Sequence, residues 1–223
     1  HEIAILNLLA NNNWERPIYY AVTVGEDSYL NLKKNFQLEG MAYRVVPINE
    51  PNRVNTDVMY DNMINKLKWG GIENPNVYMD ENNLRMTSTF RHMFTRLVDA
   101  LIHEGKKDSA RTALDYCMKV MPSSTIPPSF VCVVLAKQYY QVGEKEKAEA
   151  ILSEIKETSL QYLNWISGME AHFQHANLDE FEEHLSIFSE VLRISEGKVD
   201  KEKFEEDYQK FMAYSQLYSK LRK

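Results

Sequence analysis

The sequence repeats one pattern at a distance of 38 residues: FTRLVDALIHEGKKDSARTALDYC at residues 94–117 and CVVLAKQYYQVGEKEKAEAILSEI at residues 132–155. Each copy has apolar residues at helical spacing, then a glycine, Gly105 or Gly143, and then a second helical run. Positions three and four apart share one face of a helix, so each copy predicts two helices whose apolar stripes face each other across a glycine turn. One hairpin leaves an apolar face uncovered, and stacked neighbouring hairpins are therefore expected.

The repeated pattern resembles the tetratricopeptide repeat, a helical hairpin unit with aromatic, leucine, small and tyrosine sites followed by alanine, aromatic and proline sites. The first copy fills these sites with Phe94, Leu97, Val98, Leu101, Ala110 and Pro122, with valine at a small site and leucine where tyrosine is usual. The second copy departs further, with Cys132 at the aromatic site and Leu160 in place of the proline. The resemblance implies a tetratricopeptide-like array of helical hairpins, an α-α superhelix.

The chain after the second copy predicts a third helical pair and a terminal helix. Residues 162–175 and 178–195 have helical periodicity, and we expect Trp165, Met169 and Phe173 to face the apolar residues of the second of these helices. A last helix is expected at about residues 201–221. Terminal repeats are commonly atypical because one face meets water, so this end is interpreted as the cap of the array.

The chain before residue 80 differs from the later chain in amino-acid composition. Fifteen of the seventeen asparagines lie at or before Asn83, and these residues favour turns and caps, whereas the later sequence is rich in helix-forming residues. We therefore predict two domains, residues 1–79 and residues 80–223. The overall fold class is mainly α, with the hairpin array preceded by a small α/β region.

The first region is expected to contain about two strands and several short helices. Residues 17–24 and 41–46 are rich in β-branched and aromatic residues and predict strands. Residues 29–38 predict a short helix between them. A further helix is expected to begin at Thr56 or Asp57, either of which can serve as its N-cap. Asp80 is expected to cap the long helix of the first hairpin.

Composition excludes several classes of protein. The formal net charge of −6 argues against a nucleic-acid binder, which needs a basic face. No apolar run approaches the length of about 18 residues that spans a bilayer. Cys117 and Cys132 stand at apolar helix positions and are interpreted as buried free thiols rather than a disulfide.

No residue pattern predicts a catalytic centre, a metal site or a cofactor site. His172, His175 and His184 could be brought together, but they lack supporting cysteines or a zinc-binding spacing and are interpreted as surface histidines. The paired acidic residues lie among lysines and fit solvated helix faces. Motifs of nucleophilic hydrolases and nucleotide-binding loops are missing from the sequence.

Two groups of residues are the candidate binding residues. The inner face of the hairpin array is expected to show His92, Thr95, Asp99 and His103 from the first copy and Phe130, Val133, Lys137 and Tyr140 from the second. The first region has a polar and aromatic cluster suited to contact with a sugar, a phosphate or a protein partner, or simply to packing of a small sheet on helices. It consists of Trp14, Arg16, Tyr19, Tyr20, Tyr43 and Arg44, of which Arg16, Tyr20 and Arg44 are the candidate binding residues. Strand alternation predicts Tyr43 and Arg44 on opposite faces, with Tyr20 and Arg16 on one face.

Four stretches of the sequence carry a further resemblance: NNWERPIYYA at residues 12–21, QLEGMAYRVVP at residues 37–47, RVNTDVMYDN at residues 53–62 and KWGG at residues 68–71. In combination they resemble the tail of a bacterial family of large multi-pass membrane proteins that was long a domain of unknown function. That family is similar to the transmembrane protein O-mannosyltransferases, which join a polytopic catalytic half to a C-terminal repeat domain.

The resemblance implies that the chain is a non-catalytic, extracytoplasmic (periplasmic) C-terminal region of a glycosyltransferase that uses a lipid-linked sugar. The catalytic acidic residues of such enzymes lie in the membrane half, so none is carried over to this chain. The start at His1 rather than Met fits a fragment of a longer protein. The implied partners are the missing membrane domain of the same chain and an acceptor protein. Our hypothesis is that the Arg16/Tyr20/Arg44 region faces the membrane half and the helical hairpins face the acceptor.

Two alternatives stay open from the sequence. The chain could be a freestanding tetratricopeptide-type module that binds a protein partner. It could also be a surface carbohydrate-binding protein, with Trp14 and Tyr20 as the residues that stack on the sugar.

Overall fold

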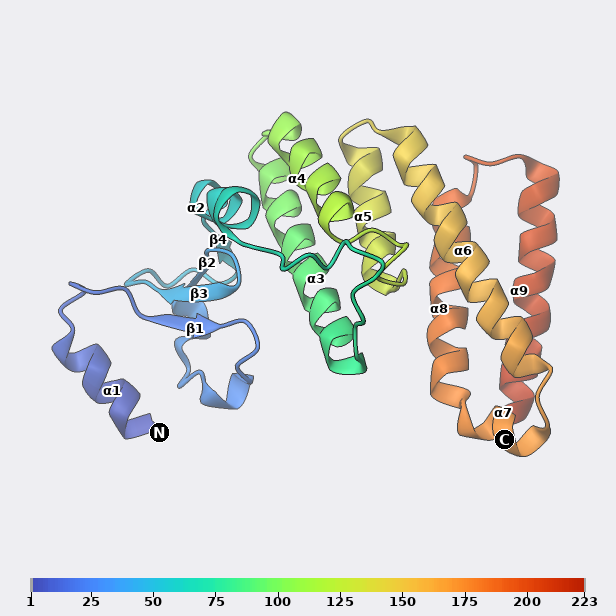
Figure 1. The fold of residues 1–223 in the computed structure, drawn as a ribbon, viewed down its shortest axis with the longest axis horizontal. Helices are drawn as coiled ribbons and strands as arrows, with labels where there is room; N and C mark the ends of the chain where they lie inside the picture. The colour runs from blue at the N-terminus through green and yellow to red at the C-terminus, as the bar shows by residue number, and fades with distance from the viewer. Residues whose placement is uncertain (1, 223) are drawn as a thin grey trace. The chain divides into compact units, whose positions relative to one another are not determined.

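The computed structural model describes residues 2–222, which form two compact units, residues 2–121 and residues 122–222. The first unit contains a four-stranded sheet, several short helices and one long helical hairpin, and the second unit is entirely helical (Figure 1). The fold class is therefore the mainly helical one expected, with a small sheet that precedes the helical hairpins along the chain. The domain boundary predicted after residue 79 rests on a change in amino-acid composition, and it stays a prediction.

The elements of the first unit run from α1 to α4. They are α1 (Glu2–Asn11), β1 (Tyr19–Ala21), η1 (Glu26–Ser28), η2 (Leu32–Asn35), β2 (Phe36–Leu38), β3 (Ala42–Val45), β4 (Arg53–Val54), α2 (Thr56–Tyr60), the π-helical turn η3 (Asp61–Lys66), α3 (Glu81–His103) and α4 (Lys107–Val120). The second unit contains α5 (Phe130–Gln141), α6 (Lys145–Ser167), α7 (Ala171–Ala176), α8 (Leu178–Ser195) and α9 (Lys201–Leu221).

The sheet has the strand order β1-β3-β2-β4, with β3 antiparallel to both β1 and β2 and with β4 parallel to β2. The two expected strands appear as β1 and β3. The predicted helix at residues 29–38 is wrong in its second half, because Phe36–Leu38 is a buried strand. Its pairing with β3 and β4 outweighs the weak helical preference of the segment. The two-residue β4 is too short to show any alternation in the sequence.

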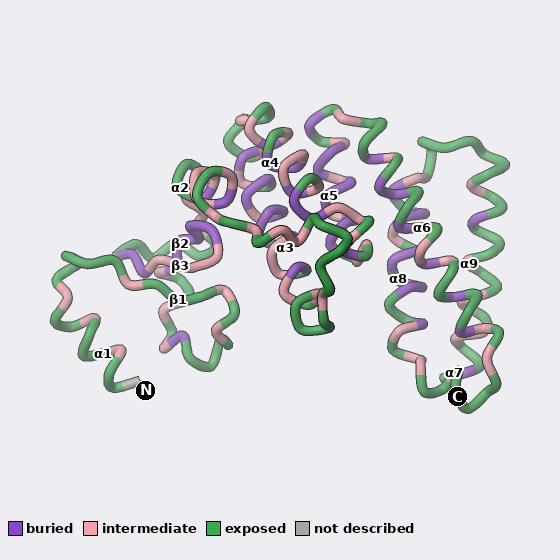
Figure 2. The backbone as a smooth tube through the Cα atoms, viewed as in Figure 1, coloured by how far each residue is buried: buried purple, intermediate pink, exposed green. Residues whose placement is uncertain are grey.

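One face of the sheet is covered by an aromatic cluster and by α1. Tyr20, Tyr29, Phe36 and Val45 are buried there, and Ile5 and Leu9 of α1 pack against them. The ring centroids of Tyr20 and Phe36 lie 5.0 Å apart. The remaining length of α1 is mostly exposed (Figure 2).

The sequence predicts the N-caps of two helices, and the structure confirms one of them. The Asp80 carboxylate accepts a hydrogen bond from the Asn83 N–H at 2.8 Å and caps α3, as predicted. The N-cap of α2 is Asn55, whose side chain accepts from the Val58 N–H, so the prediction of Thr56 or Asp57 is wrong. Thr56 is instead turned toward the α3–α4 turn, where its hydroxyl donates to Glu104 at 2.7 Å.

The two predicted hairpins are present as α3–α4 in the first unit and α5–α6 in the second. The apolar residues of both repeats are buried at the facing surfaces, among them Leu97, Leu114 and Leu135. Gly105 and Gly143 lie at the two turns with φ of +76° and +89°, a conformation that residues with a Cβ adopt at a cost. The local pattern of the repeat is therefore confirmed.

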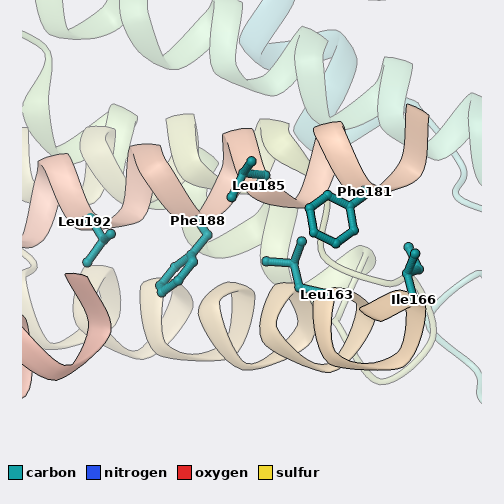
Figure 3. Close-up of a cluster of buried hydrophobic side chains, with 6 residues drawn as sticks. All are labelled: Leu163, Ile166, Phe181, Leu185, Phe188 and Leu192. Atoms are coloured by element: carbon teal, nitrogen blue, oxygen red, sulfur yellow. The ribbon is translucent and has the colours of Figure 1, made fainter. Parts of the chain in front are cut away.

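The predicted third pair is different in the structure. Helix α6 continues without a break to Ser167, so its phase is set by the residues that it buries earlier, such as Ile155. That phase turns Leu163 and Ile166 toward α8 and leaves Trp165 57% exposed, so the expected inward direction of Trp165 and Phe173 is wrong. The core of this region joins α6 to α8 and consists of Leu163, Ile166, Phe181, Leu185, Phe188 and Leu192 (Figure 3). Helix α9 packs on the same cluster through its aromatic residues.

Candidate functional site: a polar row across the small sheet

Four polar side chains form a continuous row across the four strands. In the strand register Tyr19 lies opposite Arg44, Arg44 opposite Gln37, and Gln37 opposite Arg53. Side chains of directly paired residues project from the same face of a sheet, so the four share one face. The next row, through Tyr20, Tyr43, Leu38 and Val54, projects from the opposite face.

Glu39 directly follows β2, and its carboxylate lies against the polar row and is only 3% exposed. The Tyr19 hydroxyl donates to it at 2.9 Å, and the Gln37 amide donates to its other oxygen at 2.6 Å. A guanidinium nitrogen of Arg44 lies 3.7 Å from the same oxygen as Gln37. A buried carboxylate is costly without partners, and these three groups compensate for the lost water.

The row continues through Gln37 to the far edge of the sheet. Arg53 donates from Nε to the side-chain amide oxygen of Gln37 at 2.7 Å and from Nη1 to the carboxylate of Glu50 at 3.0 Å. Gln37 therefore accepts from Arg53 and donates to Glu39, which fixes the orientation of its amide. Both arginines remain partly exposed, so the face presents guanidinium donors above a buried carboxylate.

The side chains of this face offer hydrogen-bonding groups. Burial and the hydrogen bond to Glu39 raise the pKa of Tyr19, so it is a neutral phenol at physiological pH. Acid–base catalysis by a pair of carboxyl groups needs both groups to face one cleft. The two carboxylates near this row are held separately. Arg53 binds Glu50, whereas Tyr19 and Gln37 bind Glu39. The partly exposed arginines and the phenol are suited to hold carbonyl, carboxylate or hydroxyl groups of a partner.

The three candidate residues of the first region fall in different places. Arg44 belongs to the polar row, and Tyr43 projects from the opposite face, as strand alternation predicts. Tyr20 is buried in the aromatic cluster, where burial raises its pKa. Arg16 lies on an exposed bend before β1, and its carbonyl accepts from Asn12. Because Tyr20 is buried, it offers no surface on which a sugar could stack.

Sequence reasoning placed Tyr19 in the polar and aromatic cluster but missed Gln37, Glu39 and Arg53. Gln37 and Glu39 are two residues apart, which is the spacing of one strand face, but the sequence predicts a helix that ends between them, at residue 38. Arg53 has no local signal, because only the parallel pairing of β4 with β2 brings it to Gln37.

The candidate residues on α3 are exposed with one exception. Asp99 and His103 lie one turn apart, with His103 Nε2 3.9 Å from Asp99 Oδ2. His92 lies on the same helix, and partial burial, together with the nearby charge of Arg96, lowers its pKa. Thr95 is buried, so its expected place on an open groove is wrong.

The candidate residues on α5 are engaged with other helices of the second unit. Lys137 forms an ion pair with Glu190 of α8, which also holds Arg193 at 2.7 and 2.8 Å. The hydrogen bonds lower the pKa of Glu190 to about 2, and the bond from Arg193 has a larger effect than the bond from Lys137. Tyr140 is half-buried and carries the ammonium of Lys198 4.3 Å from its ring centroid. Val133 is buried rather than open to a groove.

The histidines and cysteines have structural surroundings. His184 is buried rather than on the surface: its ring stacks on Tyr162 at 4.1 Å, and burial lowers its pKa. Cys117 and Cys132 are both buried free thiols. Within residues 2–222, no three His, Cys, Asp or Glu side chains lie where they could together hold a metal ion.

The polar row lies inside a region that matches a known family. Residues 1–66 match the model of a family described as TMEM260-associated domain 2, and this region ends at the last residue of η3. The comparisons with curated proteins and with solved structures give no match. Along the described part of the chain, no helix combines the length and apolar character needed to cross a membrane.

Proposed function

We propose that this chain is the non-catalytic C-terminal region of a polytopic, protein O-mannosyltransferase-like membrane glycosyltransferase, on the extracytoplasmic (periplasmic) side. Its sheet region packs on the membrane half, and its helical hairpins position an acceptor protein. The observation that carries the proposal is the family match over residues 1–66, because it coincides with α1, the complete sheet and the polar row. The description of that family refers to a transmembrane protein.

The surface of α1 supports the docking role. Ile5 and Leu9 pack on the sheet, but Ile3, Leu6 and Leu8 are 84%, 54% and 62% exposed. A helix that is apolar on nearly all sides is typical of a buried position. Trp14, which follows α1, is also exposed, so several large apolar side chains on and just after this helix are left without cover in the described part of the chain.

The docking role is tested in membranes of cells that produce the full-length gene product. A photo-crosslinking amino acid at Leu8 is expected to react with an apolar segment outside residues 1–223, which mass spectrometry of the cross-linked peptides identifies. The matched control is the same crosslinker at Val77, an exposed apolar residue outside the region that matches the family. Equal cross-linking from the two positions, or none from Leu8, would reject the docking role.

The acceptor role has a separate test. Asp99→Asn with His103→Ala removes the exposed pair on α3, and we expect glycosylation of acceptor proteins to fall while the enzyme keeps its cellular level. Arg85→Gln serves as the control, since Arg85 is also exposed on α3 and donates a hydrogen bond to the neighbouring Asn82 side chain. Unchanged glycosylation in the double variant would exclude these residues from acceptor positioning without affecting the docking role.

A further inference from the structure

The second unit contains a cavity of about 450 Å³ between α6, the end of α8 and the beginning of α9. One wall is apolar and includes Leu152, Leu192 and Phe204. Three lysines, Lys156, Lys198 and Lys203, also line it. Ligand-binding pockets generally have this size and this combination of apolar wall and a few polar groups.

The carboxylates around the cavity are already engaged. Asp207 lies 2.6 Å from the ammonium of Lys156, so these two charges neutralise each other. Asp200 caps α9 by accepting from the backbone N–H groups of residues 202 and 203. Glu149 lies 3.5 Å from Lys145, which is outside the cavity lining.

Two lysines of the cavity are left without a carboxylate. Among the residues that the structure describes, neither Lys198 nor Lys203 forms an ion pair, and Lys198 lies over the ring of Tyr140. Burial raises the pKa of Tyr140, so the ring remains a neutral phenol and adds no negative charge. The cavity therefore combines an apolar wall with two ammonium groups that have no ion-pair partner among the described residues.

We propose that this cavity binds a short peptide segment in which an acidic side chain stands next to an apolar one. The carboxylate would meet Lys198 and Lys203, and the apolar side chain would lie against Leu152 and Phe204. A phosphate group is less suited, because Asp200 already occupies the first backbone N–H groups of α9 that would hold it. The proposal rests on the cavity alone and does not depend on the membrane context.

The test uses two capped tetrapeptides, one of alternating glutamate and leucine and one of alternating glutamine and leucine. Both are titrated into ¹⁵N-labelled protein, residues 1–223, and amide chemical shifts are followed. We expect saturable shifts around the cavity with the acidic peptide and affinity at least about tenfold lower with the neutral one. Equal affinities, or no saturation with the acidic peptide, would overturn the proposal.

Substitutions locate the binding. Lys198→Gln and Lys203→Gln are each expected to weaken the acidic peptide about fivefold, while the melting temperature stays close to that of the parent protein because both residues are exposed. Lys201→Gln is the matched control: it removes the same charge from the same segment, but Lys201 does not line the cavity. An equal loss in the control would contradict the proposal, as would displacement of the peptide by inorganic phosphate at low millimolar concentration.

Discussion

The ion-pair cluster of Glu190 allows a prediction with a worked magnitude. The carboxylate is 20% exposed and receives hydrogen bonds from Arg193 of its own helix and from Lys137 of α5. Its pKa falls from an ordinary 4.5 to about 2. One pKa unit corresponds to about 1.4 kcal/mol, so the upper bound of the stabilisation is about 3.4 kcal/mol. Solvent screening at the partly exposed Lys137 and Arg193 reduces the expected value to about 1–2 kcal/mol.

The sign of the pH dependence follows from the lowered pKa. The folded carboxyl group holds its proton more weakly than the unfolded one, so the cluster contributes fully above about pH 4.5 and loses its contribution as the pH falls toward 2. Glu190→Gln should therefore destabilise the second unit by about 1–2 kcal/mol at pH 7. At pH 2 the variant and the parent protein should be nearly equal.

Amide hydrogen exchange in α5 and α8 measures this difference for the second unit alone, and it is repeated at several pH values. Glu183→Gln is the matched control, because Glu183 is an exposed residue on the same helix. Equal losses of protection in the two variants, or a loss in Glu190→Gln that persists at pH 2, would refute the reasoning.

Three further predictions test the core, the sheet and a turn. Leu163→Ala should cost about 2–5 kcal/mol in urea unfolding, whereas Trp165→Ala should stay within about 0.5 kcal/mol; the reverse order would contradict the helix phase of α6. Tyr19→Phe removes a donor to the buried Glu39 and should cost about 1–2 kcal/mol in the unfolding of the sheet, and no change would show that water replaces the phenol. Gly105→Ala should cost about 1 kcal/mol and Gly105→Asn less, because φ is +76° and no atom lies within 4 Å of an added Cβ; equal melting temperatures for both variants would argue against a backbone origin.

Much of the helical part could be predicted because its signals are local. The spacing of Leu97 and Leu114 around Gly105, repeated 38 residues later, specifies two helices and a turn without reference to the rest of the chain. The Asp80 cap is equally local, since a short side chain reaches an N–H group three residues on. The same reasoning failed at Trp165, where the phase depends on the unbroken length of α6 rather than on the nearest apolar residues.

The polar row of the sheet depended on the tertiary structure. Tyr19, Gln37, Glu39 and Arg53 are spread over 35 positions of the chain, and only the register of four strands brings them together. Strand pairing is a non-local interaction, so a three-residue strand such as β2 carries little evidence of its partners in its own sequence. The sequence by itself therefore determined the helices and their turns, whose hydrogen bonds close within a few residues. Folding alone decided which charges share the sheet face and which lysines of the cavity lack an ion pair among the described residues, because these depend on contacts between distant segments.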